Sequence, residues 1–144
     1  ADLVTATVRS IRGAADDDSV LVLRHASGVM SYLSASAVAG APGPRIRVLG
    51  SQGALVINDL DPQEALLRQG KFPENGVWSE PTKSRAFIHR GDEVEEIEAV
   101  SGNYALFYSQ VGLAISGSGQ WPIPNDDALQ VSHIIDQARE ISFR

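Results

Sequence analysis

Four side chains in this 144-residue chain are candidates for contacts with a small molecule: Arg24, His25, Arg45 and Trp78. Arg24 and His25 stand together where an apolar run meets a glycine-containing turn. Arg45 follows Gly-Pro and opens another apolar run, and its guanidinium has the geometry to bind a carboxylate or a phosphate. Trp78 lies in a long loop, where an indole ring can stack on a sugar. Each also has a structural interpretation: a turn residue for His25, an ion pair or bonds to loop carbonyls for Arg45, and a plug over the core for Trp78.

The other titratable residues do not form the sets that catalysis or metal binding requires. The three histidines are far apart in the sequence, and the run Asp16–Asp18 lacks the spacing of a calcium loop. The glutamates of residues 93–98 alternate in direction, so they do not pair as acid and base. Glycine-rich phosphate-binding motifs and nucleophile-elbow motifs are also absent from the sequence. The sequence therefore assigns no catalytic residue, no cofactor-binding residue and no metal ligand to this chain.

Composition narrows the class of protein. The net charge is −6 and the 12 basic residues are scattered, which argues against a nucleic-acid partner. No cysteine is present, and no apolar run approaches the roughly 20 residues of a membrane-spanning helix. The length fits one domain, and we expect a cytoplasmic protein. Because the chain opens with Ala1 and continues at once into a strand-like run, we also expect it to be a fragment or a processed form of a longer protein.

The run DPQEALLRQG, residues 61–70, predicts a short helix. Asp61 suits the N-cap, Pro62 the first helical position and Glu64 the third, which together make a capping box. Gly70 suits the position after the last helical turn. The segment 70–84 that follows is long for a loop without secondary structure, so it is a candidate functional loop.

The remaining pattern predicts strands before this helix and longer helices after the last strands. Alternating apolar residues and turn residues predict strands at 3–12, at 19–37 (two strands around a turn at 25–28), at 45–50, 54–58, 85–90 and 93–100. Stripes of apolar residues predict helices at 103–116 and 126–141. This order predicts an α+β fold with an open, mostly antiparallel β-sheet and helices on one face.

Several predicted strands are apolar on both faces. Val20 and Val22 alternate with Leu21 and Leu23, so each face of that strand carries two aliphatic side chains. A sheet with two apolar faces needs a cover on each. If the helices cover one face, the other is available for dimerisation.

The order and spacing of these motifs resemble the C-terminal domain of the Gfo/Idh/MocA family of NAD(P)-dependent oxidoreductases. The resemblance runs from about Asp18 to Ser142. It is carried by LRHASG (23–28), GPRIRVLGSQGAL (43–55), DPQEALLRQG (61–70), the VWSEP loop (77–81) and the final pair of helices with WPIP (121–124) between them.

The resemblance implies a longer protein whose N-terminal Rossmann domain binds NAD or NADP and carries a catalytic lysine in an EKP-like motif. Residues 1–144 would then be a single C-terminal domain for substrate binding and oligomerisation, which binds no cofactor and is inert by itself. Its partners would be its own Rossmann domain, further copies through the sheet face, and a sugar, inositol or related polyol. The alternative is a stand-alone binding or scaffold protein with this fold.

Overall fold

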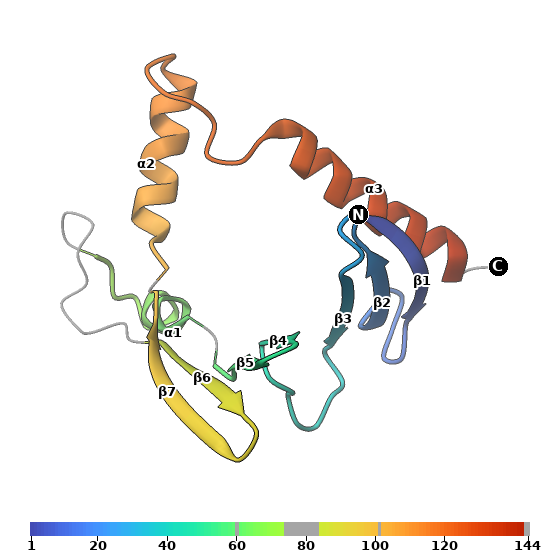
Figure 1. The fold of residues 1–144 in the computed structure, drawn as a ribbon. Helices are drawn as coiled ribbons and strands as arrows, with labels where there is room; N and C mark the ends of the chain where they lie inside the picture. Colours follow the sequence, from blue (N-terminus) through green and yellow to red (C-terminus); the bar gives the residue numbers. More distant parts are fainter. Residues whose placement is uncertain (60, 74–83, 101, 143–144) are drawn as a thin grey trace. The chain divides into compact units, whose positions relative to one another are not determined.

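The structure is a computed structural model that describes residues 1–59, 61–73, 84–100 and 102–142. The chain divides into two compact units, which are described separately. The first unit joins Ala1–Ala41 to Ile123–Arg144, and the second unit is Pro42–Pro122. Figure 1 shows the elements of both units along the chain.

The first unit is a three-stranded antiparallel sheet with one helix packed on an edge strand. Its strands hydrogen-bond in the order β1-β2-β3, and helix α3 lies along β1 (Figure 1). The bounds are β1 Asp2–Arg9, β2 Asp18–Arg24, β3 Met30–Ser36 and α3 Asn125–Ser142.

Small apolar side chains make the core of the first unit. Ala6 and Val8 of β1 pack against Ala138 of α3, and all three are buried. Leu3 and Leu21 pack around them. The hydroxyl of Ser142 accepts a hydrogen bond from the backbone N–H of Val8 at 2.9 Å, which ties the last turn of α3 to the same strand.

The loop between β1 and β2 corrects the sequence prediction. The first strand ends at Arg9 rather than at residue 12, because the carboxylate of Asp17 accepts hydrogen bonds from the backbone N–H groups of Ile11 and Arg12 at 2.8 and 2.9 Å. Those N–H groups are therefore held within the loop. Asp18, predicted to lie in the loop, opens β2 and pairs with Arg9.

The predicted turn between β2 and β3 is confirmed. The backbone N–H of Gly28 donates to the carbonyl of His25 at 2.9 Å, and Gly28 has φ 84°. That conformation favours glycine because other residues strain their Cβ there.

The described residues of the second unit form a four-stranded antiparallel sheet and two helices. The strands hydrogen-bond in the order β4-β5-β6-β7. The bounds are β4 Ile46–Gly50, β5 Gly53–Ile57, α1 Pro62–Arg68, β6 Ser84–Arg90, β7 Glu93–Ala99 and α2 Tyr104–Ile115.

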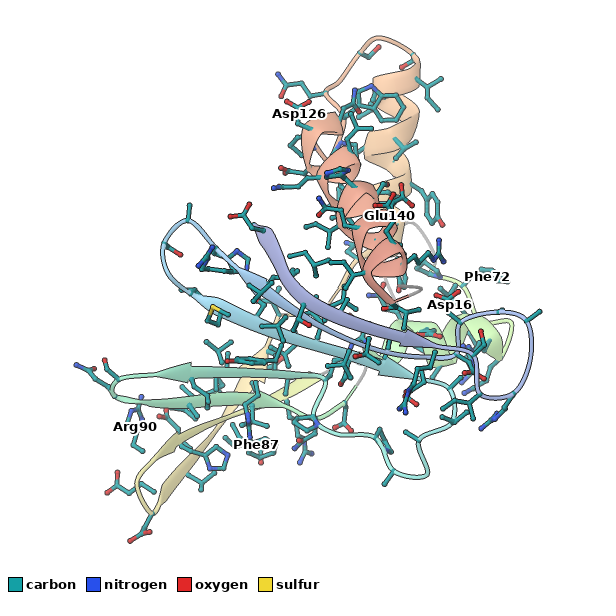
Figure 2. The ribbon with its side chains drawn as sticks, turned by 90° about the vertical axis from the view of Figure 1, so that its right-hand side faces the viewer. Asp16, Phe72, Phe87, Arg90, Asp126 and Glu140 are labelled. Atoms are coloured by element: carbon teal, nitrogen blue, oxygen red, sulfur yellow. The ribbon has the colours of Figure 1, made fainter. Side chains whose placement is uncertain are left out.

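Strand β7 is an edge strand, as its density of glutamates predicts. Arg90 lies at the end of β6 beside the hairpin turn (Figure 2), and its Nη1 is 2.8 Å from Oε2 of Glu95. Arg85 pairs with Glu96 across the opposite face of the same two strands. These exposed ion pairs lie along an edge that like charge protects from pairing with another strand.

The predicted fold class is confirmed: the chain is α+β, and its described residues form open antiparallel sheets and three helices. The strands hydrogen-bond as one three-stranded and one four-stranded sheet. The three helices lie where the sequence predicts them, within one residue at each end.

The apolar stripe predicted on the helix at 103–116 does not face a core. No residue of α2 is buried, and Tyr108 and Ile115 are 69% and 73% exposed. On α3, Ala138 is buried but Val131 and Ile135 are exposed, so only part of the predicted stripe meets the sheet.

Candidate functional site

A pocket lies in the second unit, where helices α1 and α2 begin. It has a volume of about 370 Å³. Its lining combines three aromatic rings with a carboxylate, two side-chain amides and a glycine backbone: Asp61, Gln63, Gly102, Asn103, Tyr104, Phe107 and Tyr108.

Local sequence signals determine where helix α1, which begins at this pocket, starts and ends. Asp61 is the N-cap and its Oδ1 accepts from the backbone N–H of Gln63 at 2.9 Å, while Pro62 takes the first position. At the other end Gly70 has φ 74°, and the N–H groups of Gly70 and Lys71 bond back to the carbonyls of Leu67 and Leu66. This is a Schellman motif, so the predicted cap and stop are both confirmed.

The predicted role of Glu64 in a capping box differs from what the structure shows. Its Oε1 accepts from Nη2 of Arg68 at 2.6 Å, an ion pair one turn further along α1. Gln63, rather than Glu64, directs its side chain to Asp61: its Nε2 donates to Oδ1 at 3.0 Å.

Asp61 and Gln63 also reach the start of helix α2. Oδ2 of Asp61 accepts from the backbone N–H of Gly102 at 2.6 Å. Oε1 of Gln63 accepts from the backbone N–H of Tyr104 at 3.3 Å. We call these four residues, Asp61, Gln63, Gly102 and Tyr104, the helix latch.

The helix latch is close-packed. Gln63 is 1% exposed, which makes it the most buried polar side chain among the described residues. A Cβ at Gly102 would collide with the carboxylate of Asp61 and would lie 2.7 Å from Nε2 of Gln63. A larger residue at position 102 would therefore have to displace the side chains of Asp61 and Gln63.

Helix α2 supplies the aromatic wall of the pocket, made of Tyr104, Phe107 and Tyr108. Its N-cap is Asn103, whose Oδ1 accepts from the backbone N–H of Leu106 at 2.9 Å. The rings of Phe107 and Tyr108 meet edge to face, with centroids 5.4 Å apart. Such a wall suits a ring with an apolar face, and the carboxylate and amides can bond to hydroxyl groups at its rim.

The carboxyl of Asp61 is held in its charged form. Burial raises its pKa, but the hydrogen bonds from Gln63 and Gly102 lower it by more, so the net pKa is below the ordinary value of 3.8. A charged carboxylate is the better acceptor for the two backbone N–H groups of the latch.

None of the predicted contact residues Arg24, His25 and Arg45 is among the residues that line this pocket. Arg24 ends β2 and is exposed, and His25 is half-buried with Nε2 2.8 Å from the hydroxyl of Ser31. Arg45 is exposed just before β4, in the second unit, to which the pocket also belongs. Trp78 and most of the predicted functional loop lie outside the described residues. Arg24 and His25 are adjacent in the chain and belong to the first unit.

Sequence reasoning found Asp61 as a cap but missed Gln63 and the aromatic wall as parts of a pocket. The available signals were DPQ at one helix start and GNY at another. Nothing in either run shows that the two helix starts meet.

Two further observations concern the described residues alone. They contain no group of three histidine, aspartate or glutamate side chains placed to hold a metal ion. None of their helices is both long and apolar enough to cross a membrane.

Comparison with known families accounts for this arrangement of strands and helices. The family described as "Oxidoreductase family, C-terminal alpha/beta domain" matches residues 3–142, nearly the whole chain. The chain belongs to the Gfo/Idh/MocA oxidoreductase family, as its C-terminal domain. This confirms the resemblance stated from the sequence, and enzymes of the family are in general NAD(P)-dependent.

Two curated relatives support the assignment. The uncharacterized oxidoreductase YdgJ of Escherichia coli is 34% identical over 107 residues, which cover 72% of this chain and 31% of that protein. Bacillus subtilis IolW, named scyllo-inositol 2-dehydrogenase (NADP(+)), is 27% identical over 119 residues, or 79% of this chain and 33% of that protein. The chain therefore spans about a third of the length of each.

Solved structures show the same fold. A Bacteroides fragilis protein described as an oxidoreductase matches with TM-score 0.77 and 28% identity, over 99% of this chain and 45% of that one. The protein yvaA of Bacillus subtilis, also described as an oxidoreductase, matches with TM-score 0.77 and 26% identity, over 97% of this chain and 42% of that one.

Proposed function

We propose that this chain is the substrate-side and oligomerisation domain of an NAD(P)-dependent oxidoreductase that acts on a sugar, inositol or related polyol. The observation that carries the proposal is the family match over residues 3–142. The relative named as a scyllo-inositol dehydrogenase favours a cyclic polyol as the substrate class.

The pocket of the second unit supports a binding role. An aromatic wall beside a carboxylate and amides complements a ring that has an apolar face and a hydroxyl rim. The described residues of this pocket offer no paired acid and base at its rim. The domain would bind and orient the substrate, with hydride transfer assigned to the part of the enzyme that holds NAD(P).

The residues at this site do not fit a dinucleotide. A pyrophosphate needs free backbone N–H groups at a helix start behind a glycine-rich turn. At the start of α2 the N–H of Gly102 is already bonded to Asp61, whose negative charge would repel a phosphate. We therefore assign cofactor binding to an N-terminal Rossmann domain that partners this one.

The test is to compare the 144-residue chain with the full product of its natural reading frame. With NADP⁺ or NAD⁺, the full product should form reduced cofactor from scyllo-inositol or another cyclic polyol. The 144-residue chain should form none, and calorimetry should detect no binding of reduced cofactor. Micromolar binding of NADPH or NADH by the 144-residue chain alone would refute the proposal that cofactor binding belongs to a separate Rossmann domain.

A reading frame that encodes no Rossmann domain upstream of Ala1 would favour the alternative, a stand-alone binding or scaffold protein. The polar and aromatic residues that line the pocket motivate this second candidate, because they can bind a ligand without catalysis. The two candidates differ in one observable, the presence of reduced cofactor after incubation with polyol.

Oligomerisation through a sheet face is the second part of the proposal. In the first unit, Val22 pairs with Tyr32 on the face opposite Leu21, which packs toward α3. Tyr32 is 76% exposed there. Light scattering at tens of micromolar should give at least twice the chain mass of 15.4 kDa, and Tyr32→Asp should lower it to one chain. His133→Asp, on the exposed side of α3, is the matched control.

A further inference from the structure

Asp61 does more than cap helix α1. An N-cap needs one side-chain oxygen as acceptor, and Oδ1 serves that purpose by accepting from the N–H of Gln63. The second oxygen, Oδ2, accepts from Gly102, which is 41 residues further along the chain. The carboxylate therefore holds the starts of two helices at once.

Gln63 repeats this double contact. Its Nε2 donates to Asp61 and its Oε1 accepts from the backbone N–H of Tyr104. A glutamine at the second position of an exposed helix would normally point into solvent, yet this one is 1% exposed. Its burial is explained by the contact between helices and not by the stability of α1 alone.

The helix latch ends at the aromatic wall. Tyr104 is both the residue whose N–H the latch holds and the first ring of the wall, and Phe107 lies one turn further along α2. Because no residue of α2 is buried, packing does little to fix this helix. Directional hydrogen bonds at its first turn are the described contacts that can set its position.

We propose that Asp61 and Gln63 are positioning residues for the pocket: they hold the first turn of α2, and with it the aromatic wall, and they do so while Asp61 is a carboxylate. The inference concerns the shape of the pocket and stands whether or not the ligand is a polyol.

The variant Asp61→Asn separates the helix cap from the latch. Asparagine caps helices as well as aspartate does. It has only one acceptor oxygen, however, and its –NH₂ group cannot accept from a backbone N–H. Asp61→Asn should therefore keep α1 folded while it releases Gly102.

Hydrogen exchange in the full 144-residue chain, followed by NMR, measures this release. In Asp61→Asn the amide of Gly102 should exchange roughly tenfold faster or more, the order expected when a hydrogen bond to a charged group is lost. The amide of Tyr104 should follow, and the ring signals of Phe107 and Tyr108 should shift. Unchanged exchange at Gly102 and Tyr104 would overturn the proposal and leave Asp61 as a local cap.

Asp17→Asn is the matched control. Asp17 also accepts two backbone N–H bonds, but from Ile11 and Arg12 in its own loop of the first unit. This variant should speed exchange at residues 11 and 12 and leave Gly102 and Tyr104 as they are. An equal effect of both variants on Gly102 would mean general destabilisation and would also overturn the proposal.

Gln63→Met tests the second half of the latch with a side chain of similar length and no hydrogen-bonding amide. It should speed exchange at Tyr104, and the double variant with Asp61→Asn should do little more than the larger single change, because the two residues act as one unit. Additive effects would show two independent contacts and would contradict the proposal.

A pH titration of the unaltered chain keeps the proposal testable if Asp61→Asn fails to fold. The amides of Gln63, Gly102 and Tyr104 should shift together, with one midpoint below 3.8. The other titratable groups at this site are the phenols of Tyr104 and Tyr108 and the carboxylate of Glu64, which pairs with Arg68 on α1. Separate midpoints for the three amides would overturn the proposal.

Discussion

The two units hold their long helices in different ways. In the first unit, α3 lies on a strand through buried small side chains, Ala6, Val8 and Ala138. In the second unit, α2 has no buried residue, and its first turn is bonded to the polar side chains of Asp61 and Gln63. Apolar contact spreads its stabilisation over an area, whereas the latch concentrates it in a few directional bonds. We expect the apolar contact of α3 to tolerate small changes in side-chain shape. We expect the hydrogen bonds of the latch to be lost when a single donor or acceptor atom is displaced.

The largest effect is expected from a charge in the apolar contact of the first unit. Ala138→Asp should lower the free energy of unfolding by more than about 3 kcal/mol, because an unpaired carboxylate would be buried against Ala6 and Val8. Urea unfolding followed by circular dichroism measures the loss. His133→Asp, exposed on the same helix, should change stability by less than about 0.5 kcal/mol. Equal midpoints for the two variants would show that α3 is not held by this contact.

A single methyl group should distinguish the latch from the rest of α2. Gly102→Ala should lower the free energy of unfolding by about 1–3 kcal/mol, since the new Cβ collides with Asp61 and Gln63. The same substitution at Gly112, inside α2 with no atom within 4 Å of the new Cβ, should raise it by about 0.5–1 kcal/mol. Thermal unfolding of both variants gives the signs, and the same sign for both would refute the close packing of the latch.

Acid should weaken the latch before it affects the apolar contact. The folded-state pKa of Asp61 lies below the ordinary value of 3.8. Its contribution to the free energy of unfolding is therefore complete above pH 3.8, and it is lost as the pH falls through the folded-state pKa. In urea unfolding between about pH 5 and pH 2, Asp61→Asn should lose stability less steeply than the unaltered chain. Part of the slope should remain, because backbone hydrogen bonds from Ile11 and Arg12 also lower the pKa of Asp17. If the free energy of unfolding depends on pH with the same slope in Asp61→Asn and in the unaltered chain, Asp61 has the same pKa in the folded and unfolded states.

The smallest effect is expected at the surface of α1. Glu64→Ala removes the exposed ion pair with Arg68 and should cost only about 0.2–0.5 kcal/mol, less in high salt. A loss above roughly 1 kcal/mol, the size of a cap, would instead support the capping box that the sequence predicts for Glu64. Thermal unfolding at low and high salt decides between them.

The comparison also shows which parts of the site were predictable. The ends of α1 are predicted by Asp61, Pro62 and Gly70, because helix caps and stops depend on residues only a few positions apart. Gln63 gives no such signal, since its burial depends on Tyr104 and not on its own neighbours in the chain. Residue type and a neighbouring turn indicate Arg24, His25 and Arg45 as candidates, but neither feature specifies which pocket a side chain lines.

The sequence by itself determined the helices, the hairpin turns and the α+β class of this protein. Those features follow from local backbone preferences and from the period of apolar residues, both of which act within a few positions. Only the tertiary structure decided that the strands hydrogen-bond as sets of three and four, that the stripe of α2 stays exposed, and that Asp61 meets Gly102. These depend on contacts between residues far apart in the chain, whose partners no local pattern specifies.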